Sequence, residues 1–243
     1  MANLKINKKE SILIDALVEE YKNHAGQIET FLNVFRTYLS ENDELNKHIH
    51  SIKTRMKDPE HLRDKLQRKI LKHKQEKTKF TITSENLLTE INDLAGIRIL
   101  HLHNSQMQHI DPLLQDIFAE NSYRLIEGPG ARTWDDEYRK YFESINIEVQ
   151  VSETLYTSVH YVVGSASRLK MTCEVQVRTL SEEIWGEVDH QLNYPHKTNS
   201  LACAEQLKVL ARVTSSTTRL VDSIFRSYDD YYKEKGVVNK KSK

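Results

Sequence analysis

The chain has 243 residues, of which 29% are charged and 38% hydrophobic, and its 35 Lys and Arg residues balance 35 Asp and Glu residues. This composition is typical of a soluble globular protein, and the length suits one substantial domain with helical additions. No apolar run approaches the ~18–20 residues of a membrane span, and the polar opening MANLKINKKE is unlike a signal peptide, so we expect a cytoplasmic protein without membrane contact. Cys173 and Cys203 form no CxxC pair, which argues against a zinc knuckle or a disulfide framework.

The balanced net charge hides one basic segment. Residues 47–79 contain 12 Lys and Arg residues against 4 Asp and Glu residues, so the rest of the chain is net negative. A polyanion would be drawn to this segment.

Helical spacing dominates the first third of the chain. Apolar residues recur three or four apart over residues 11–39, with Gly26 as the expected division between two helices. A further helix is predicted from Asp58, which can cap it, through Pro59 to Ile70. Ser84 is then expected to cap a short helix that ends near Ile91.

Strand signals begin at Gly96 and alternate with helical ones. We expect strands at 97–102, 123–126, 147–151, 158–163 and 171–177, and a helix at 106–118. Residues 127–146 have no clear period and are interpreted as a long loop that could include a helical turn. A capping box of Thr179 and Glu182 predicts a helix that stops near Pro195, and two further helices should fill residues 200–234 before a basic tail.

The common signatures of phosphate and metal sites are missing. Neither GxxxxGK[ST] nor GxGxxG occurs, so side chains would have to hold any nucleotide, and there is no HExxH. The pairs His48/His50 and His101/His103 could face one side of a strand, which is a weak indication of a metal site.

The strongest local pattern is the strand TCEVQVR. Glu174, Gln176 and Arg178 would share one face, because successive side chains on a strand point to opposite faces. The preceding strand repeats this alternation with Tyr156, Ser158 and His160. Together the two strands would form a polar floor, which either belongs to a binding site or is a solvated sheet face.

Blocks of sequence over residues 50–195 carry a resemblance to a known family. They are RMKDPEHLRDKLQRK at 55–69, DLAGIR at 93–98, YTSVH at 156–160, EVQVRT at 174–179 and WGEVDHQLNYP at 185–195. In this order they resemble the synthetase domain of RelA/SpoT-type alarmone synthetases, most closely the small single-domain members. The resemblance implies that the β,γ-diphosphate of ATP moves to the 3′-hydroxyl of a guanosine nucleotide, GDP or GTP, giving a (p)ppGpp-type alarmone and AMP.

The resemblance also implies roles for the basic residues. Arg55 and Arg98 would sandwich the adenine, because planar guanidinium groups stack on rings. Lys57, Lys65 and Arg68 would neutralise the triphosphate, and Arg178 is expected among the nucleotide-binding residues. The alternatives are an ion pair of Arg98 with Asp93 and a solvated helix face for the others.

Two carboxylates would carry the chemistry. Asp93 and Glu174 are expected to hold Mg²⁺, with Glu174 also the candidate base for the attacking hydroxyl. His160 and Gln176 would lie near the transferred phosphates, and Tyr156 would stack on the acceptor base. Gly96 is expected to let the backbone turn between carboxylate and arginine. Capping or a salt bridge for Asp93, and cross-strand packing for the others, remain the alternatives.

More than one acceptor of the diphosphate is compatible with the sequence. Relatives place a glycine before the stacking tyrosine and an arginine after it, whereas residues 154–158 here are TLYTS. Some small relatives are toxins that transfer pyrophosphate to the 3′ end of tRNA, and the segment 47–79 with the tail Lys240–Lys243 could contact RNA. A silent nucleotide-binding module is a third hypothesis.

These observations predict an α+β fold: a mixed, largely antiparallel sheet flanked by helices, of the nucleotidyltransferase-like synthetase type. We expect the synthetase domain at 46–197 and helical extensions at 1–45 and 198–243. The extensions either cover the sheet or mediate homo-oligomerisation, tRNA docking or contact with an antitoxin or regulatory protein.

Overall fold

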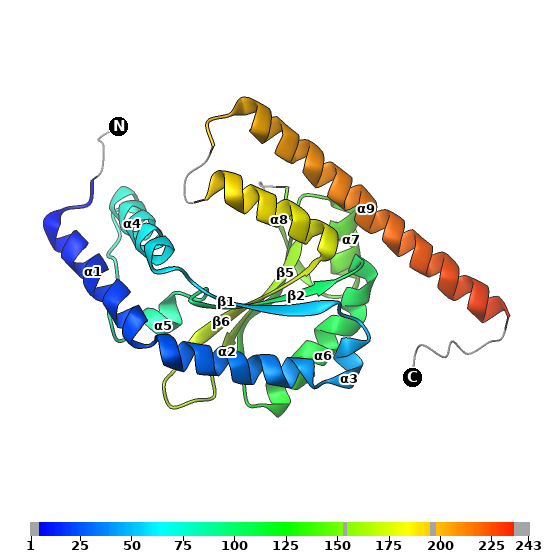
Figure 1. Ribbon diagram of the computed structural model, residues 1–243, viewed down its shortest axis with the longest axis horizontal. Helices are drawn as coiled ribbons and strands as arrows, with labels where there is room; N and C mark the ends of the chain where they lie inside the picture. The colour runs from blue at the N-terminus through cyan, green and yellow to red at the C-terminus, as the bar shows by residue number, and fades with distance from the viewer. Residues whose placement is uncertain (1–4, 153–154, 195–197, 236–243) are drawn as a thin grey trace.

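The computed structural model describes residues 5–152, 155–194 and 198–235. In these residues one mixed sheet has the strand order β1-β2-β6-β5-β3-β4 (Figure 1). The strands are β1 (Ser51–Met56), β2 (Ala95–His101), β3 (Arg124–Thr133), β4 (Glu148–Val151), β5 (Ser158–Gly164) and β6 (Thr172–Thr179). The β2–β6 and β3–β4 pairs are parallel and the other three pairs are antiparallel, so the predicted mixed, largely antiparallel sheet is confirmed.

Helices cover the sheet on two sides. In Figure 1, α2 (Ala25–Ser40) and α6 (Met107–Glu120) lie below the sheet, while α8 (Leu180–Asn193) and α9 (Leu201–Glu234) lie above it. Helix α1 (Lys8–Asn23) packs against α4 (Pro59–Glu76). The shorter elements are α3 (Asp43–Asn46), α5 (Leu87–Glu90), α7 (Asp136–Ser144) and the 3₁₀ helix η1 (Asn104–Gln106).

The first two helices belong to the main hydrophobic core. Buried side chains of α1 and α2, such as Leu17 and Phe35, join one cluster with the sheet residues Ile97 and Val175. The N-terminal helices therefore cover part of the sheet, as one of the alternatives proposed. The division of the chain at 46–197 stays a prediction. In the described ranges, no helix is long and apolar enough to cross a membrane.

Helix ends follow the predicted capping residues in part. Asp58 accepts hydrogen bonds from the backbone N–H groups of Glu60 and His61, which confirms the cap of α4. The break between α1 and α2 falls at His24, so the predicted division at Gly26 is two residues late. The predicted cap at Ser84 is wrong, because α5 begins after Asn86, whose side chain instead accepts from the Thr83 N–H.

Strand β1 was not predicted from the sequence. Its polar side chains, Lys53 and Arg55, are exposed, and its apolar ones are only partly buried because β1 is an edge strand. The alternation of apolar and polar residues that predicts a strand is therefore weak in the β1 sequence.

The predicted loop at 127–146 is mostly regular structure. Strand β3 continues to Thr133 through two register shifts near Glu127 and Gly130, and α7 follows. The bulged GPG segment breaks the alternation that would have marked the strand. At Gly128, φ is +94°, and a Cβ would lie 2.4 Å from the His160 carbonyl oxygen, so only glycine lets β3 approach β5 this closely.

The two helices predicted for 200–234 are one helix, α9. In the run of Ser and Thr at 214–218, the hydroxyls of Thr214, Thr217 and Thr218 donate to carbonyls three or four residues earlier. These side chains therefore stay within the helix. The predicted stop of α8 at Pro195 and the basic tail 240–243 lie outside the described residues, and α8 ends at Asn193.

Candidate active site

The register of the central strands builds a polar floor. Arg55 on β1 lies beside Gly96 on β2, which lies beside Glu174 on β6. In the next row Lys53 pairs with Arg98, Arg98 with Gln176, and Gln176 with His160 of β5. Glu174 and Gln176 therefore share one face, as predicted, and His160 of β5 lies on the same face.

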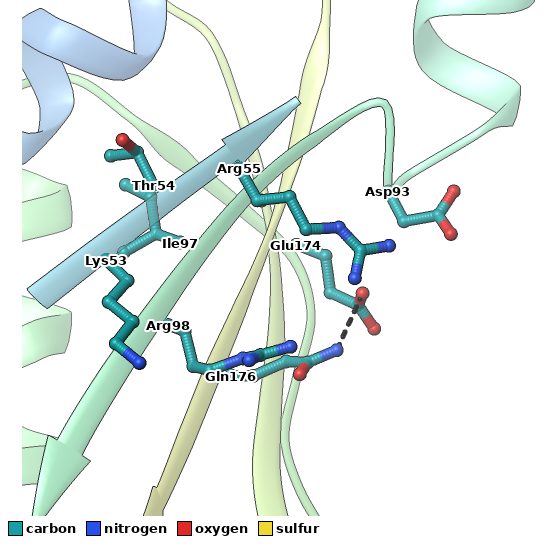
Figure 2. Close-up of a pocket in the computed structure, with 9 residues that line it drawn as sticks. Lys53, Thr54, Arg55, Asp93, Ile97, Arg98, Glu174 and Gln176 are labelled. Atoms are coloured by element: carbon teal, nitrogen blue, oxygen red, sulfur yellow. Dashed lines mark hydrogen bonds between the residues drawn. The ribbon is translucent and has the colours of Figure 1, made fainter. Parts of the chain in front are cut away.

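A cleft of about 250 Å³ lies over this floor (Figure 2). Figure 2 shows Arg55 and Arg98 extending from β1 and β2 toward the side on which Asp93 and Glu174 lie. Gly96 lies within β2 on the cleft floor rather than in a turn, so the predicted reason for this glycine is wrong. Without a side chain at this position, the space between Arg55 and Glu174 stays open.

Asp93 is held by two lysines. Its Oδ2 lies 2.8 Å from Lys57 Nζ and its Oδ1 lies 2.7 Å from Lys65 Nζ. Burial alone would raise the pKa of the Asp93 carboxyl, but the ammonium groups of Lys65 and Lys57 outweigh it and lower the pKa. Asp93 is therefore ionised at neutral pH. The salt bridge predicted as an alternative role for Asp93 is confirmed, with Lys57 and Lys65 as its partners.

The second carboxylate is fixed by its strand neighbours. Glu174 Oε1 lies 3.2 Å from His160 Nδ1, and the Gln176 amide donates to Glu174 Oε2 at 3.0 Å. Burial would raise the pKa of the Glu174 carboxyl, but the hydrogen bond and charge of His160 outweigh it and lower the pKa. Both carboxyl groups are thus ionised, and each is only partly exposed.

Asp93 and Glu174 also line a second, larger cavity of about 610 Å³. On its other sides lie Lys65 and Lys69 of α4, the bulged part of β3, and Gln150 and Glu148 of β4. The two carboxylates therefore form the boundary between two neighbouring cavities. This is the arrangement that a transfer between two bound molecules requires.

Arg98 is paired with helix α8 rather than with Asp93. Its Nη1 lies 3.0 Å from Glu183 Oε1 and 2.5 Å from Glu187 Oε1, so the predicted alternative of an Arg98–Asp93 ion pair is wrong. Glu183 also binds Lys53 at 3.0 Å and contacts Arg178. Burial would raise the pKa of the Glu183 carboxyl, but these cations outweigh it and lower the pKa.

Four predicted site residues, which are Lys57, Arg68, Tyr156 and Arg178, line neither cavity. Arg178 is 4% exposed beneath α8, where its guanidinium lies 5.7 Å from the centre of the Tyr156 ring. Tyr156 also packs against Trp185, with ring centres 6.0 Å apart. Arg68 is exposed on α4 and lines neither cavity. Their proposed nucleotide contacts stay predictions.

The carboxylates fit one kind of metal ion. No group of three or more His, Cys, Asp or Glu side chains in the part of the chain that the structure describes could hold a metal by itself. The predicted histidine pairs do not converge: His48 stacks on His109, and His101 is buried against the backbone of His103. Asp93 and Glu174 nevertheless suit Mg²⁺, which uses one or two carboxylates and completes its shell with water and substrate phosphates.

Sequence reasoning missed several residues of the site. Lys53 could have been found from its spacing of two before Arg55 on a strand, and Glu183 with Glu187 from their spacing of four on a helix. Nothing in the sequence indicated that β3 and β4 line the second cavity, because those contacts depend on the bulge at Gly128.

This chain is similar to known proteins both in sequence and in fold. A family model described as a region found in RelA / SpoT proteins matches residues 54–199, whereas no curated protein sequence matches the chain. The fold is similar to that of small alarmone synthetase 1 from Bacillus subtilis bound to its product pppGpp, with 18% identity, a TM-score of 0.55, and coverage of 88% of this chain and 97% of that one.

Two further solved structures have a similar fold. For the same Bacillus subtilis protein bound to AMPCPP, the identity is 17%, the TM-score 0.54, and the coverage 89% of this chain and 98% of that one. For a GTP pyrophosphokinase family protein from Streptococcus pneumoniae, the identity is 17%, the TM-score 0.55, and the coverage 93% and 97%. At these identities the structures show a common fold.

Proposed function

The chain belongs to the RelA/SpoT family, and on this premise we propose that it is a pyrophosphokinase that transfers the β,γ-diphosphate of ATP to the 3′-hydroxyl of a guanosine nucleotide. The observation that carries the proposal is the pair Asp93 and Glu174, two ionised carboxylates at the boundary of two cavities. A Bacillus subtilis relative with the same fold has been solved with pppGpp and with AMPCPP, which supports nucleotide ligands for both cavities.

The cleft over β1 and β2 suits the donor. Arg55 and Arg98 present two guanidinium groups to it, and planar guanidinium groups stack on purine rings while attracting phosphate charge. Arg55 forms no ion pair with any residue that the structure describes, so its charge is available to a ligand. Lys65, which is partly exposed, could reach a phosphate, whereas the buried Lys57 acts as the fixed counter-ion of Asp93.

Asp93 and Glu174 would hold Mg²⁺, which offsets the charge that builds up on phosphate oxygens during transfer. Glu174 would also accept the proton of the attacking hydroxyl. Its lowered pKa makes it a weak base, so positioning must contribute most of the acceleration. His160 and Gln176 hold the Glu174 carboxylate in place between the two cavities.

A Glu174→Gln variant tests this assignment. We expect it to lose at least about 100-fold in transfer rate while still binding AMPCPP, because the donor cleft keeps its arginines. Purified protein is incubated with γ-labelled ATP and GDP, GTP or deacylated tRNA, and the products are separated. Turnover equal to that of the wild type would refute the role of Glu174, and an inactive wild type that binds nucleotide would support the silent binding module.

A second candidate function is transfer to the 3′ end of tRNA. The second cavity is lined by Lys65, Lys69 and Arg132 against five carboxylates, which are Glu90, Asp93, Glu127, Glu148 and Glu174. This lining suits an acceptor with little charge, such as the terminal nucleoside of an RNA, better than a free nucleotide with a 5′-di- or triphosphate. The same assay decides: label only on tRNA would support the second candidate and refute the first.

A further inference from the structure

The donor cleft contains a contact that a nucleotide would have to change. Arg98 lies in the cleft floor, yet its Nη1 is bonded to two carboxylates of α8, Glu183 at 3.0 and 3.2 Å and Glu187 at 2.5 Å. A guanidinium bound by two carboxylates has little net attraction left for phosphate. Arg55, on the neighbouring strand β1, has no such partner among the ion pairs of the described chain.

The two glutamates differ in their surroundings. Glu183 is 8% exposed and contacts three cations, Lys53, Arg98 and Arg178, so it is part of the support for the floor. Glu187 lies one helical turn further along, is 52% exposed, and forms an ion pair with Arg98. Removing the Glu187 charge would therefore leave Arg98 held in position by Glu183.

We propose that Glu187 is an autoinhibitory residue of the donor cleft, which occupies Arg98 in the free protein and lowers the affinity for a nucleoside triphosphate. The inference rests on the proposed function, because it takes the cleft over β1 and β2 as the donor site. Two effects add: Glu187 competes for Arg98, and its charge repels the polyphosphate that enters the cleft. Because Glu187 is exposed, the repulsion is screened by salt.

The test compares Glu187→Gln and Glu187→Ala with the wild type in calorimetric titrations with AMPCPP and Mg²⁺ at low and high salt. We expect the dissociation constant of both variants to fall about 3- to 10-fold at low salt, with a smaller gain at high salt. Glu205→Gln is the matched control. It removes the same charge from an exposed glutamate that pairs with Lys208 on α9, away from the cleft, and it should bind like the wild type.

The outcomes separate this inference from the proposed function. If the wild type binds AMPCPP and both Glu187 variants bind equally or more weakly, the autoinhibitory role is refuted while the donor site stands. If Glu205→Gln tightens binding as much as Glu187→Gln does, a general charge effect replaces the local one. If no folded variant, wild type included, binds AMPCPP, both the donor site and the inference fail.

Discussion

Glu182 is a buried carboxyl with few hydrogen-bond partners. It is 1% exposed, its Oε1 has no hydrogen-bond partner, and its Oε2 accepts only a long bond of 3.4 Å from the Thr157 N–H. Burial raises the pKa of the carboxyl to about 8, and Asp135 adds to the shift. At neutral pH the folded protein therefore holds Glu182 largely protonated.

This raised pKa predicts the pH dependence of stability. Between the ordinary pKa of 4.5 and about 8, the folded state keeps a proton that the unfolded state has lost, so stability falls as pH rises through this window. Glu182→Gln should remove a slope of up to ~1.4 kcal/mol per pH unit. Urea unfolding at pH 5, 7 and 9 measures it, with Glu205→Gln as an exposed control. Parallel pH profiles for wild type and Glu182→Gln would contradict the prediction.

Strand alternation was enough to predict which residues share the floor, but not what covers it. Glu174, Gln176 and His160 were identified because side-chain direction on a strand is fixed by the backbone. Arg178 continues the same alternation, yet it lies under α8, whose docking is a tertiary contact. The burial of Lys57 against Asp93 likewise depends on a tertiary contact, so strand alternation could not predict it.

Helix α8 is fitted to the sheet by a glycine. A Cβ at Gly186 would lie 2.5 Å from Arg178 Nη1, and Arg178 is 4% exposed with its Nε unpaired. Gly186→Ala should therefore displace Arg178 and destabilise the protein by about 1–3 kcal/mol. Gly26→Ala is the matched control: it lies in α2 with nothing within 4 Å of the added Cβ, and it should stabilise by about 0.5–1 kcal/mol. Chemical denaturation measures both, and equal effects would contradict the packing argument.

Helix α9 is attached to the body through a partly buried carboxylate, Asp222, and a buried one, Asp135. Asp222 Oδ1 lies 2.8 Å from His103 Nδ1 and accepts from the Ser105 N–H at 3.1 Å. Burial would raise the pKa of the Asp222 carboxyl, but the His103 and Ser105 hydrogen bonds outweigh it and lower the pKa. Nearer the start of α9, the Ser215 hydroxyl donates to Asp135 Oδ2 at 2.9 Å.

Asp222→Asn should loosen the second half of α9. Removing the charge weakens a buried hydrogen-bond cluster by about 1–3 kcal/mol, which corresponds to roughly 10- to 100-fold faster hydrogen exchange if the helix opens locally. The start of α9 should be unaffected, because the Trp185 indole donates to the Leu207 carbonyl at 3.1 Å. Asp229→Asn, an exposed change on the same helix, is the control. Exchange that rises equally in both variants would contradict the role of Asp222.

The predictions for α7 and α9 were wrong for a common reason. Helix α7 begins at a capping Asp135 and buries Tyr138 and Phe142, four residues apart, a signal too short to stand out against the neighbouring GPG segment. Helix α9, predicted as two helices, continues through a run of Ser and Thr with low helix propensity, where Thr218 also contacts Thr179 of β6. In both cases a tertiary contact decides the local structure.

The proposed donor cleft lies where separate parts of the chain meet. Its floor comes from β1, β2 and β6, and Asp93 binds two lysines of the basic segment. Glu183 and Glu187 of α8 do not line the cleft but pair with Arg98 in its floor. These parts are far apart in sequence, so the cleft exists only in the folded chain. A ligand that binds there must therefore stabilise the whole fold rather than one element.

We expect nucleotide binding to raise the Tm in a way that depends on the carboxylate pair Asp93 and Glu174. At a concentration 100 times its dissociation constant, AMPCPP with Mg²⁺ should add about 2.7 kcal/mol of stability, a rise in Tm of roughly 5–10 °C for a chain of this length. Hydrogen exchange should slow in β2, the start of α4 and α8, but not in the second half of α9, which borders neither proposed nucleotide cavity. Asp93→Asn with Glu174→Gln should abolish the Mg²⁺-dependent part of the shift, because two ionised carboxylates are then lost. A shift that persists in this double variant would show that nucleotide and metal bind elsewhere.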